Sequence, residues 1–219
     1  LELATRLVAL QKLALAELPK RLHSKTRVIY QSAPPVCNRA APWSDAKFKV
    51  CVIGHLRAEK DPLRTALAAR RLPAASRIHV THIGRALDDA LERRARAEMK
   101  RNVRYRWIGE LSHARTRRVL AESHLLVITS RMEGSSNVLS EALASGVPVL
   151  ASKIPGLMGT LGGDFSGYFP VGDTRRLRTL LLKSQSNHRF YDLLRRQCRR
   201  LASLVKPSRE RTAWQRLLQ

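Results

Sequence analysis

From residue 48 onward, short apolar runs alternate with longer segments that have helical spacing. The apolar runs are rich in β-branched residues, which is typical of buried strands. They occupy residues 48–54, 77–84, 103–111, 124–130 and 147–152. Amphipathic segments follow the first four runs, at residues 57–72, 86–101, 112–123 and 135–145. This strict alternation predicts an α/β fold with a doubly wound, Rossmann-like parallel sheet.

The two ends of the chain are patterned differently. Apolar positions with helical spacing predict a helix over residues 1–22, and a short strand is expected at residues 28–30. Three prolines mark residues 34–47 as a linker. Toward the C-terminus we expect a glycine-rich loop at 156–163, a short strand at 167–170, and helices from Thr174, through Tyr191 to Leu204, and over 208–218.

Two helix starts are marked by capping residues. Asp61 is followed by Pro62, so we expect Asp61 to cap the helix after the first strand. Ser112 is the expected cap of the third helix.

The composition adds a strong positive charge to this picture. With 44% hydrophobic residues, the 219-residue chain can bury the core of one large or two small domains. Its formal net charge of +24 fits a nucleic-acid partner. The arginine clusters, however, lie in segments with helical spacing, at 93–96, 115–118, 175–178 and 195–200. We therefore favour solvated outer faces of helices over the alternative of a basic nucleic-acid-binding domain, and the charge would in either case attract anionic substrates.

Cysteine usage and the absence of long apolar runs indicate the compartment. Cys37, Cys51 and Cys198 are far apart and have no metal-type spacing, which suits a reducing cytoplasm without a disulfide framework. No apolar run is long enough to span a bilayer, and the start of the chain does not resemble a secretory signal. Because the chain starts at Leu1, we expect it to be a fragment of a longer protein.

A candidate ligand site follows the fourth predicted strand, in the segment SRMEGSSNVLSEALASGVPVLAS at residues 130–152. Gly134 lets the backbone approach a ligand, and Ser135 or Ser136 can cap the next helix, whose free amides suit a diphosphate. Glu141 could accept hydrogen bonds from two ribose hydroxyls, and Glu133 could face a sugar. Taken alone, the spacing favours the alternative that both glutamates are ordinary surface acids.

The loop after the first strand offers positive charge. Lys60 lies six residues after Gly54, and His55 and Arg57 lie between them. A cation there can neutralise a diphosphate leaving group, although a lone loop lysine is more often simply solvated. The sequence contains no G-x-G-x-x-G fingerprint, Walker A loop or G-x-S-x-G elbow, which argues against a nicotinamide enzyme, an NTPase and a serine hydrolase.

The order of these segments resembles the C-terminal half of family 4 glycosyltransferases of the GT-B type, over residues 25–219. That family typically shows G-R-L-x-x-E-K on the first loop and E-x7-E ahead of a G-x-P-V strand. The corresponding residues here are GHLRAEK at 54–60, the two glutamates of the candidate loop, and Gly146, Pro148 and Val149. His55 departs from the pattern, because the family usually has Arg directly after the first glycine; Arg57 is the alternative phosphate contact.

The resemblance implies specific roles for residues of this chain. Lys60 and Glu133 would be catalytic. The donor-binding residues would be Gly54, His55, Arg57, Lys60, Gly84, Ile108, Gly134, Ser135, Ser136, Asn137, Val138 and Glu141. No metal or other cofactor is implied, because cationic side chains and a helix end would replace it.

Longer strings are similar to the selenosugar synthases of selenoneine biosynthesis. They are VIYQSAPP, GHLRAEKDPLR, RLPAASRIHV, the segment at 130–152 and IPGLMGTLGGDFSGYFPVGDT. This similarity implies transfer of a sugar from a UDP-sugar, typically UDP-N-acetylglucosamine, to selenophosphate. Two alternatives remain: a family 4 glycosyltransferase with another acceptor, and a truncated nucleotide-binding module without turnover.

The resemblance also implies a domain organisation. Residues 1–33 would be the end of an N-terminal acceptor domain, 34–47 a linker, and 48–219 a nucleotide-sugar-binding domain with a C-terminal crossover helix. An N-terminal domain is then expected in the full-length protein, and without it the fragment would be inactive or impaired.

Overall fold

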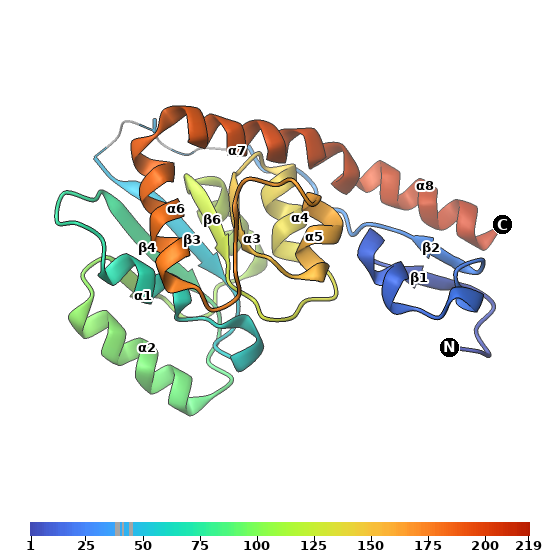
Figure 1. Ribbon diagram of the computed structural model, residues 1–219, viewed down its shortest axis with the longest axis horizontal. Coiled ribbons are helices and arrows are strands. Elements are labelled where there is room, and N and C mark those ends of the chain that lie inside the picture. Colours follow the sequence, from blue (N-terminus) through green and yellow to red (C-terminus); the bar gives the residue numbers. More distant parts are fainter. Residues whose placement is uncertain (38–39, 41, 44–45) are drawn as a thin grey trace.

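A six-stranded parallel sheet forms the centre of the computed structural model, which describes residues 1–37, 40, 42–43 and 46–219 (Figure 1). Its strands are β3 (Phe48–Ile53), β4 (Ile78–Ile83), β5 (Tyr105–Trp107), β6 (Leu125–Ile128), β7 (Val149–Ser152) and β8 (Tyr168–Phe169). They lie in the order β5-β4-β3-β6-β7-β8, and each neighbouring pair is parallel. The predicted fold class is therefore confirmed.

Helices connect the strands and cover the sheet. They are α1 (Arg64–Arg70), α2 (Asp89–Arg101), α3 (His113–Ala121), α4 (Asn137–Ala144), α5 (Pro155–Leu161), α6 (Thr174–Ser186), α7 (His188–Leu201) and α8 (Pro207–Leu218). All residues of β6 and β7 are buried, as expected for central strands covered on both faces. Ser112 caps α3 as predicted, since its hydroxyl accepts the Arg115 N–H at 3.4 Å.

The strand order reverses between β3 and β6. From β3 the chain continues outward to β4 and β5, and it then returns to place β6 on the other side of β3. In a doubly wound sheet, such a switch point opens a crevice beyond the carboxyl ends of the two strands. The loops that follow β3 and β6 therefore face each other.

The N-terminal segment differs from the predicted helix over residues 1–22. It forms a separate two-stranded parallel sheet, β1 (Leu7–Ala9) with β2 (Thr26–Val28), and short 3-10 helices at Lys12–Glu17 and Lys20–Leu22. Pro19 cannot continue a helix, and pairing with β2 satisfies the extended backbone of β1. The second strand also lies two residues earlier than the prediction of 28–30.

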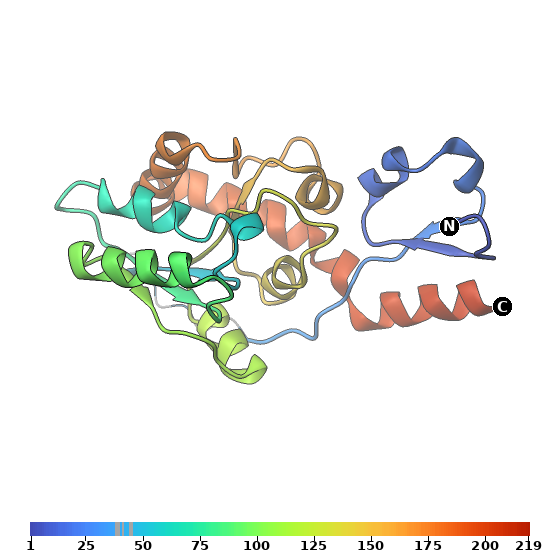
Figure 2. The same cartoon turned by 90° about the horizontal axis from the view of Figure 1, so that it is seen from below.

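The C-terminal helices were predicted more closely. Figures 1 and 2 show α7 and α8 extending along one side of the molecule until α8 lies beside the β1–β2 sheet, where both termini are found. A 3-10 helix at Ala202–Val205 joins them, so α7 ends earlier than expected. Glu210 of α8 accepts the Ser32 N–H at 2.8 Å, which ties α8 to the N-terminal segment. The division into domains at 33 and 47 stays a prediction, and part of 34–47 lies outside the described residues.

The glycine-rich loop expected at 156–163 is wrong over residues 156–161, because those residues belong to α5. A side chain at Gly156 would place Cβ 1.8 Å from the carbonyl oxygen of Glu133, and one at Gly159 would place it 1.6 Å from the Gln11 side-chain oxygen. These glycines are thus needed for close packing of a helix. Their helix-breaking tendency is outweighed by that packing.

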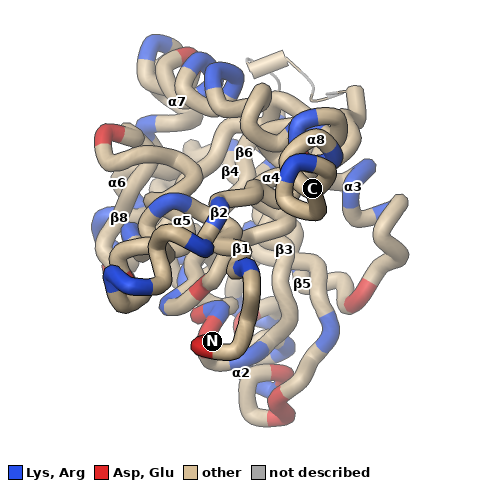
Figure 3. Tube along the Cα trace, turned by 90° about the vertical axis from the view of Figure 1, so that its right-hand side faces the viewer, with Lys and Arg blue, Asp and Glu red and all other residues tan. Residues whose placement is uncertain are grey.

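The arginine clusters lie on separate helices. Exposed arginines of the four clusters belong to α2, α3, α6 and α7. In Figure 3, basic segments appear on α7, α8, α3 and α2, with other residues between them. This distribution is the one expected for solvated helix faces. In the described part of the chain, no helix is both long enough and apolar enough to cross a membrane.

His82 links three strands at the carboxyl edge of the sheet. Its Nε2 lies 3.0 Å from the carbonyl oxygen of Gly54, and its Nδ1 lies 2.8 Å from the Tyr105 hydroxyl. The carbonyl can only accept, so Nε2 carries the hydrogen and Nδ1 accepts from Tyr105. Burial lowers the pKa of His82 to about 4. The neutral ring therefore fixes the point where β3 ends.

We expect acid to destabilise the protein through His82. The free energy of unfolding should fall as the pH drops from about 6.5 toward 4, because the unfolded chain takes up a proton that the folded ring excludes. The stabilisation is complete above pH 6.5 and is worth up to about 3 kcal/mol. Urea unfolding between pH 4 and 7 should show a shallower decline for His82→Gln. Parallel declines in the two chains would contradict this assignment.

Gly84 is expected to tolerate no side chain. Its φ is +152°, and an added Cβ would lie 2.0 Å from the Gly54 carbonyl oxygen. We predict that Gly84→Ala lowers the free energy of unfolding by about 2–4 kcal/mol. At Gly163, nothing lies within 4 Å of an added Cβ, so Gly163→Ala should change the free energy of unfolding by less than about 0.5 kcal/mol. Equal urea midpoints for the two variants would show that the backbone at Gly84 adapts.

Candidate functional site

Two loops meet at the switch point and are joined by an ion pair. Lys60, from the loop after β3, donates to Glu133 Oε1 at 2.5 Å, and Glu133 belongs to the loop after β6. The side chains of Lys60 and Glu133 are 22% and 8% exposed, so water screens the pair only partly. Ser130 Oγ donates to the same oxygen at 2.6 Å. The structure therefore brings together the two residues that the sequence resemblance assigned to catalysis.

Backbone contacts hold the same two loops in register. The Thr129 hydroxyl donates to the carbonyl oxygen of Lys60 at 2.8 Å, and the Arg131 N–H donates to that of Glu59 at 2.7 Å. Ser152 on β7 donates to the Ser130 carbonyl at 2.5 Å. The position of Glu133 is thus set by two neighbouring strands as well as by its own loop.

The loop after β3 reaches Lys60 through a 3-10 turn at Ala58–Lys60. Asp61 follows with a φ of +43°, in the left-handed region, and α1 begins only at Arg64. The predicted cap at Asp61 is therefore wrong. Its carboxylate accepts from Arg64 Nε at 2.8 Å, so the side chain is paired with an arginine and makes no cap hydrogen bond.

A pocket of about 260 Å³ lies beyond the carboxyl ends of β3 and β4. It is lined by Ile53, Gly54, His55, Arg57, Lys60, Ile83, Gly84, Glu110, Leu111, Thr116 and Val138. Six predicted donor-binding residues are among them. His55 Nδ1 accepts the Arg85 N–H at 3.0 Å, so in the neutral ring the hydrogen is on Nε2, which can donate to a ligand.

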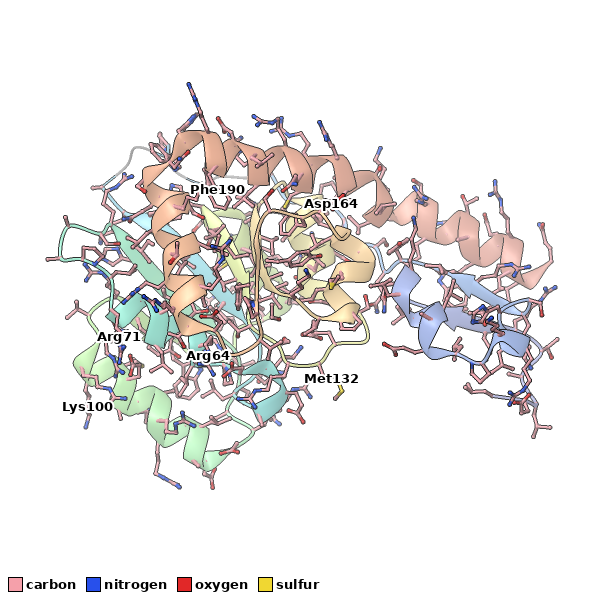
Figure 4. All side chains as sticks on the ribbon, viewed as in Figure 1. Arg64, Arg71, Lys100, Met132, Asp164 and Phe190 are labelled. Atoms are coloured by element: carbon pink, nitrogen blue, oxygen red, sulfur yellow. The ribbon has the colours of Figure 1, made fainter. Side chains whose placement is uncertain are left out.

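A second cavity, of about 570 Å³, lies on the other side of Glu133. It is lined by Glu17, Arg57, Glu59, Arg131, Met132, Glu133, Gly134, Ile154, Pro155 and Gly156. Arg57 is shared with the first pocket, and Met132 projects outward from the loop at the rim (Figure 4). Because Glu17 comes from the N-terminal segment, this cavity lies between that segment and the sheet domain.

The start of α4 faces the crevice. Ser136 is the cap, since its hydroxyl accepts the Leu139 N–H at 3.4 Å, and the first-turn amides have no partner within the helix. Ser136 and Val138 line a small cavity of about 30 Å³ beside Lys60 and Glu133. One turn further, Glu141 is buried and its Oε1 lies 2.6 Å from His113 Nε2.

The remaining predicted residues are less central. Ile108, Ser135, Ser136, Asn137 and Glu141 line neither the 260 Å³ pocket nor the 570 Å³ cavity, and of these five Ser136 alone lines the 30 Å³ cavity. The prediction had not included Glu110, Leu111, Thr116 and His113. Glu110 and Leu111 follow a strand directly, so their position beyond its carboxyl end could have indicated them. Thr116 and His113 reach the site only through the packing of α3, which no local pattern reveals.

The arrangement is suited to binding an anion. Two cationic side chains, a histidine donor and free helix amides surround one crevice, and the acid Glu133 lies at its edge. Within the described ranges, no group of three or more His, Cys, Asp or Glu residues is placed to hold a metal ion.

Three solved structures illustrate which proteins have this fold. Lipopolysaccharide outer core galactosyltransferase WaaB, in its apo form, matches with a TM-score of 0.74 and 16% identity, over 98% of this chain and 62% of that one. HepE of Anabaena, in complex with UDP-glucose, matches with a TM-score of 0.78 and 18% identity, over 98% of this chain and 63% of HepE. Sucrose-phosphate synthase of Thermosynechococcus elongatus matches with a TM-score of 0.77 and 20% identity, over 96% of this chain and 57% of the synthase. Such identities establish the fold alone, and the chain spans about three fifths of these proteins' length.

The sequence itself matches the family described as Glycosyl transferases group 1, over residues 38–191. This match covers well over half of the chain and includes both loops of the crevice and all of α4. The resemblance to GT-B glycosyltransferases is confirmed at that level. The chain belongs to the group 1 glycosyl transferases and has the fold of the C-terminal half of a GT-B enzyme.

Proposed function

We propose that this chain forms the donor half of a family 4 glycosyltransferase and binds UDP-N-acetylglucosamine in the 260 Å³ pocket. The observation that carries the proposal is the Lys60–Glu133 pair, which spans the switch point between β3 and β6. At that point, a doubly wound sheet binds its ligand. The UDP and UDP-glucose complexes of HepE, which has the same fold, support the choice of a UDP-sugar.

In this proposal the diphosphate lies between the β3 loop and the N-terminus of α4. Lys60 and Arg57 neutralise the leaving group, His55 donates from Nε2, and the amides near Ser136 bind the remaining oxygens. Lys60 is already balanced by Glu133, so the pocket has no uncompensated buried charge before the donor arrives. These cations would do the work that a metal ion does elsewhere.

The sugar and the ribose would be bound by the two glutamates. Glu133 lines both the 30 Å³ cavity and the 570 Å³ cavity. A sugar beyond the diphosphate would therefore reach Glu133 first. Glu141 sits one turn into α4 and would accept from the ribose hydroxyls. Val138 lies between these positions and lines the pocket wall.

We also propose that the acceptor is selenophosphate and that the product is a selenosugar. The support is the similarity of five sequence strings to selenosugar synthases, together with Arg57 and Arg131 in the 570 Å³ cavity, which would attract an anion. Selenium would supply the electron pair of the new carbon–selenium bond, and UDP would leave with the pair of the broken carbon–oxygen bond. Water would then attack phosphorus, the phosphorus–selenium bond would break with its electron pair going to selenium, and phosphate would leave the selenosugar. The acceptor domain, and a cytoplasmic location, would belong to the full-length protein.

Calorimetric titration tests the donor site. We expect the chain to bind UDP and UDP-N-acetylglucosamine, and Lys60→Ala and Glu141→Ala each to weaken UDP binding about tenfold or more. His79→Ala is the control, because His79 is an exposed residue on β4 near its amino end. Failure of the unmodified chain to bind UDP would overturn the proposal.

A second titration separates the sugar contact from the diphosphate contact. Glu133→Gln should abolish the gain in affinity that UDP-N-acetylglucosamine has over UDP, because the amide replaces one acceptor oxygen of the carboxylate with an N–H₂ donor. UDP itself should bind at least as tightly as before, since an acid near the diphosphate is removed. A gain that survives the substitution would place the sugar elsewhere.

A turnover assay tests the alternative of a binding module without activity. Release of UDP from UDP-N-acetylglucosamine in the presence of selenophosphate, and not in the presence of phosphate, would reject that alternative.

A further inference from the structure

Glu141 is held by a residue on a different helix. His113 is the first residue of α3, and its Nε2 lies 2.6 Å from Glu141 Oε1 in the middle of α4. The side chain of His113 is 73% exposed, whereas that of Glu141 is only 11% exposed. The contact therefore reaches from the surface to an almost buried carboxylate.

The chemistry of the two groups fixes the direction of this hydrogen bond. An ionised carboxylate can only accept, so Nε2 of His113 carries the hydrogen and donates. The bond occupies Oε1, and among the described residues Oε2 of Glu141 has no hydrogen-bond partner. One oxygen thus holds the side chain in place, and the other has no hydrogen bond within the described part of the chain that a ligand would have to displace.

A glutamate in this position needs such a partner. The side chain has three rotatable bonds, and a nearly buried carboxylate without a hydrogen bond is costly. Both helices that carry the pair are firmly placed: Ser112 caps α3 directly before His113, and Ser136 caps α4. The relative position of Nε2 and Oε1 is therefore set by rigid elements, and it aligns Glu141 before any ligand arrives.

We propose that His113 is a positioning residue that orients Glu141 so that Oε2 accepts from the ribose hydroxyls of the donor nucleotide. The inference rests on the proposed function, because it requires Glu141 to bind a ribose. It adds a specific structural requirement: ribose recognition depends on α3 as well as on α4.

The test compares two probes, UDP and 2′,3′-dideoxy-UDP, by calorimetric titration of the 219-residue chain. The unmodified chain should prefer UDP, because only UDP offers the ribose hydroxyls. His113→Ala should reduce this preference about fivefold, through weaker UDP binding, and leave dideoxy-UDP binding unchanged. His113→Gln should keep most of the preference, because the Gln side-chain N–H₂ can reach the place of the histidine Nε2.

Two controls make the outcomes distinct. The double variant His113→Ala/Glu141→Gln should show the same preference as Glu141→Gln alone, because the two residues act as one unit and their effects do not add. His79→Ala should leave the preference unchanged. If the preference survives in His113→Ala, or is lost equally in His113→Gln, the positioning role is overturned while the donor site stands. If the unmodified chain binds neither probe, the proposed function is overturned and this inference with it.

Discussion

The ion pair between one lysine and one glutamate joins the two loops that border the candidate site. Lys60 and Glu133 lie on loops that follow β3 and β6, the two strands between which the chain reverses its strand order. The topology of a doubly wound sheet produces a crevice at that place, but the side chains of the loops supply its charged groups. The ion pair closes the opening partway and divides it into a pocket on the β4 side and a wider cavity toward the N-terminal segment. The rest of the sheet domain holds these two side chains within hydrogen-bonding distance of each other.

Support for this pair comes mainly from neutral groups. His82 fixes the carbonyl of Gly54, Thr129 fixes that of Lys60, and Ser152 fixes that of Ser130. Each contact joins a side chain on, or directly after, one strand to the backbone of the segment that follows a neighbouring strand. A charged pair in a partly buried place costs desolvation, and it is tolerated when the groups around it are already positioned and hydrogen-bonded. The net charge of +24 contributes little to this local order, because the four arginine clusters lie on outer helices.

The sheet could be predicted from the sequence because its strands are almost wholly apolar and the helices between them have a different period. Lys60 and Glu133 could be predicted for the same reason, since each closely follows the end of an apolar run. The N-terminal segment could not, because regularly spaced leucines fit both a helix and a short buried strand, and only pairing with β2 decides between them. His113 lies 28 residues from Glu141 in the sequence, and their contact depends on how α3 packs beside α4. The site was thus predictable where strand ends define it, and not where helix packing does.

The two glycines of α5 have a mechanical consequence. Gly156 lies directly against the backbone of Glu133, and Gly159 lies directly against the side chain of Gln11, which is itself held by the Leu13 N–H at 2.6 Å. Neither glycine has a side chain that could absorb a displacement. Helix α5 therefore packs without any intervening side chain against the N-terminal segment and against the loop that carries Glu133. A tilt of that segment would move the carbonyl of Glu133, so the geometry of the 570 Å³ cavity depends on the orientation of a part of the chain that shares no strand with the central sheet.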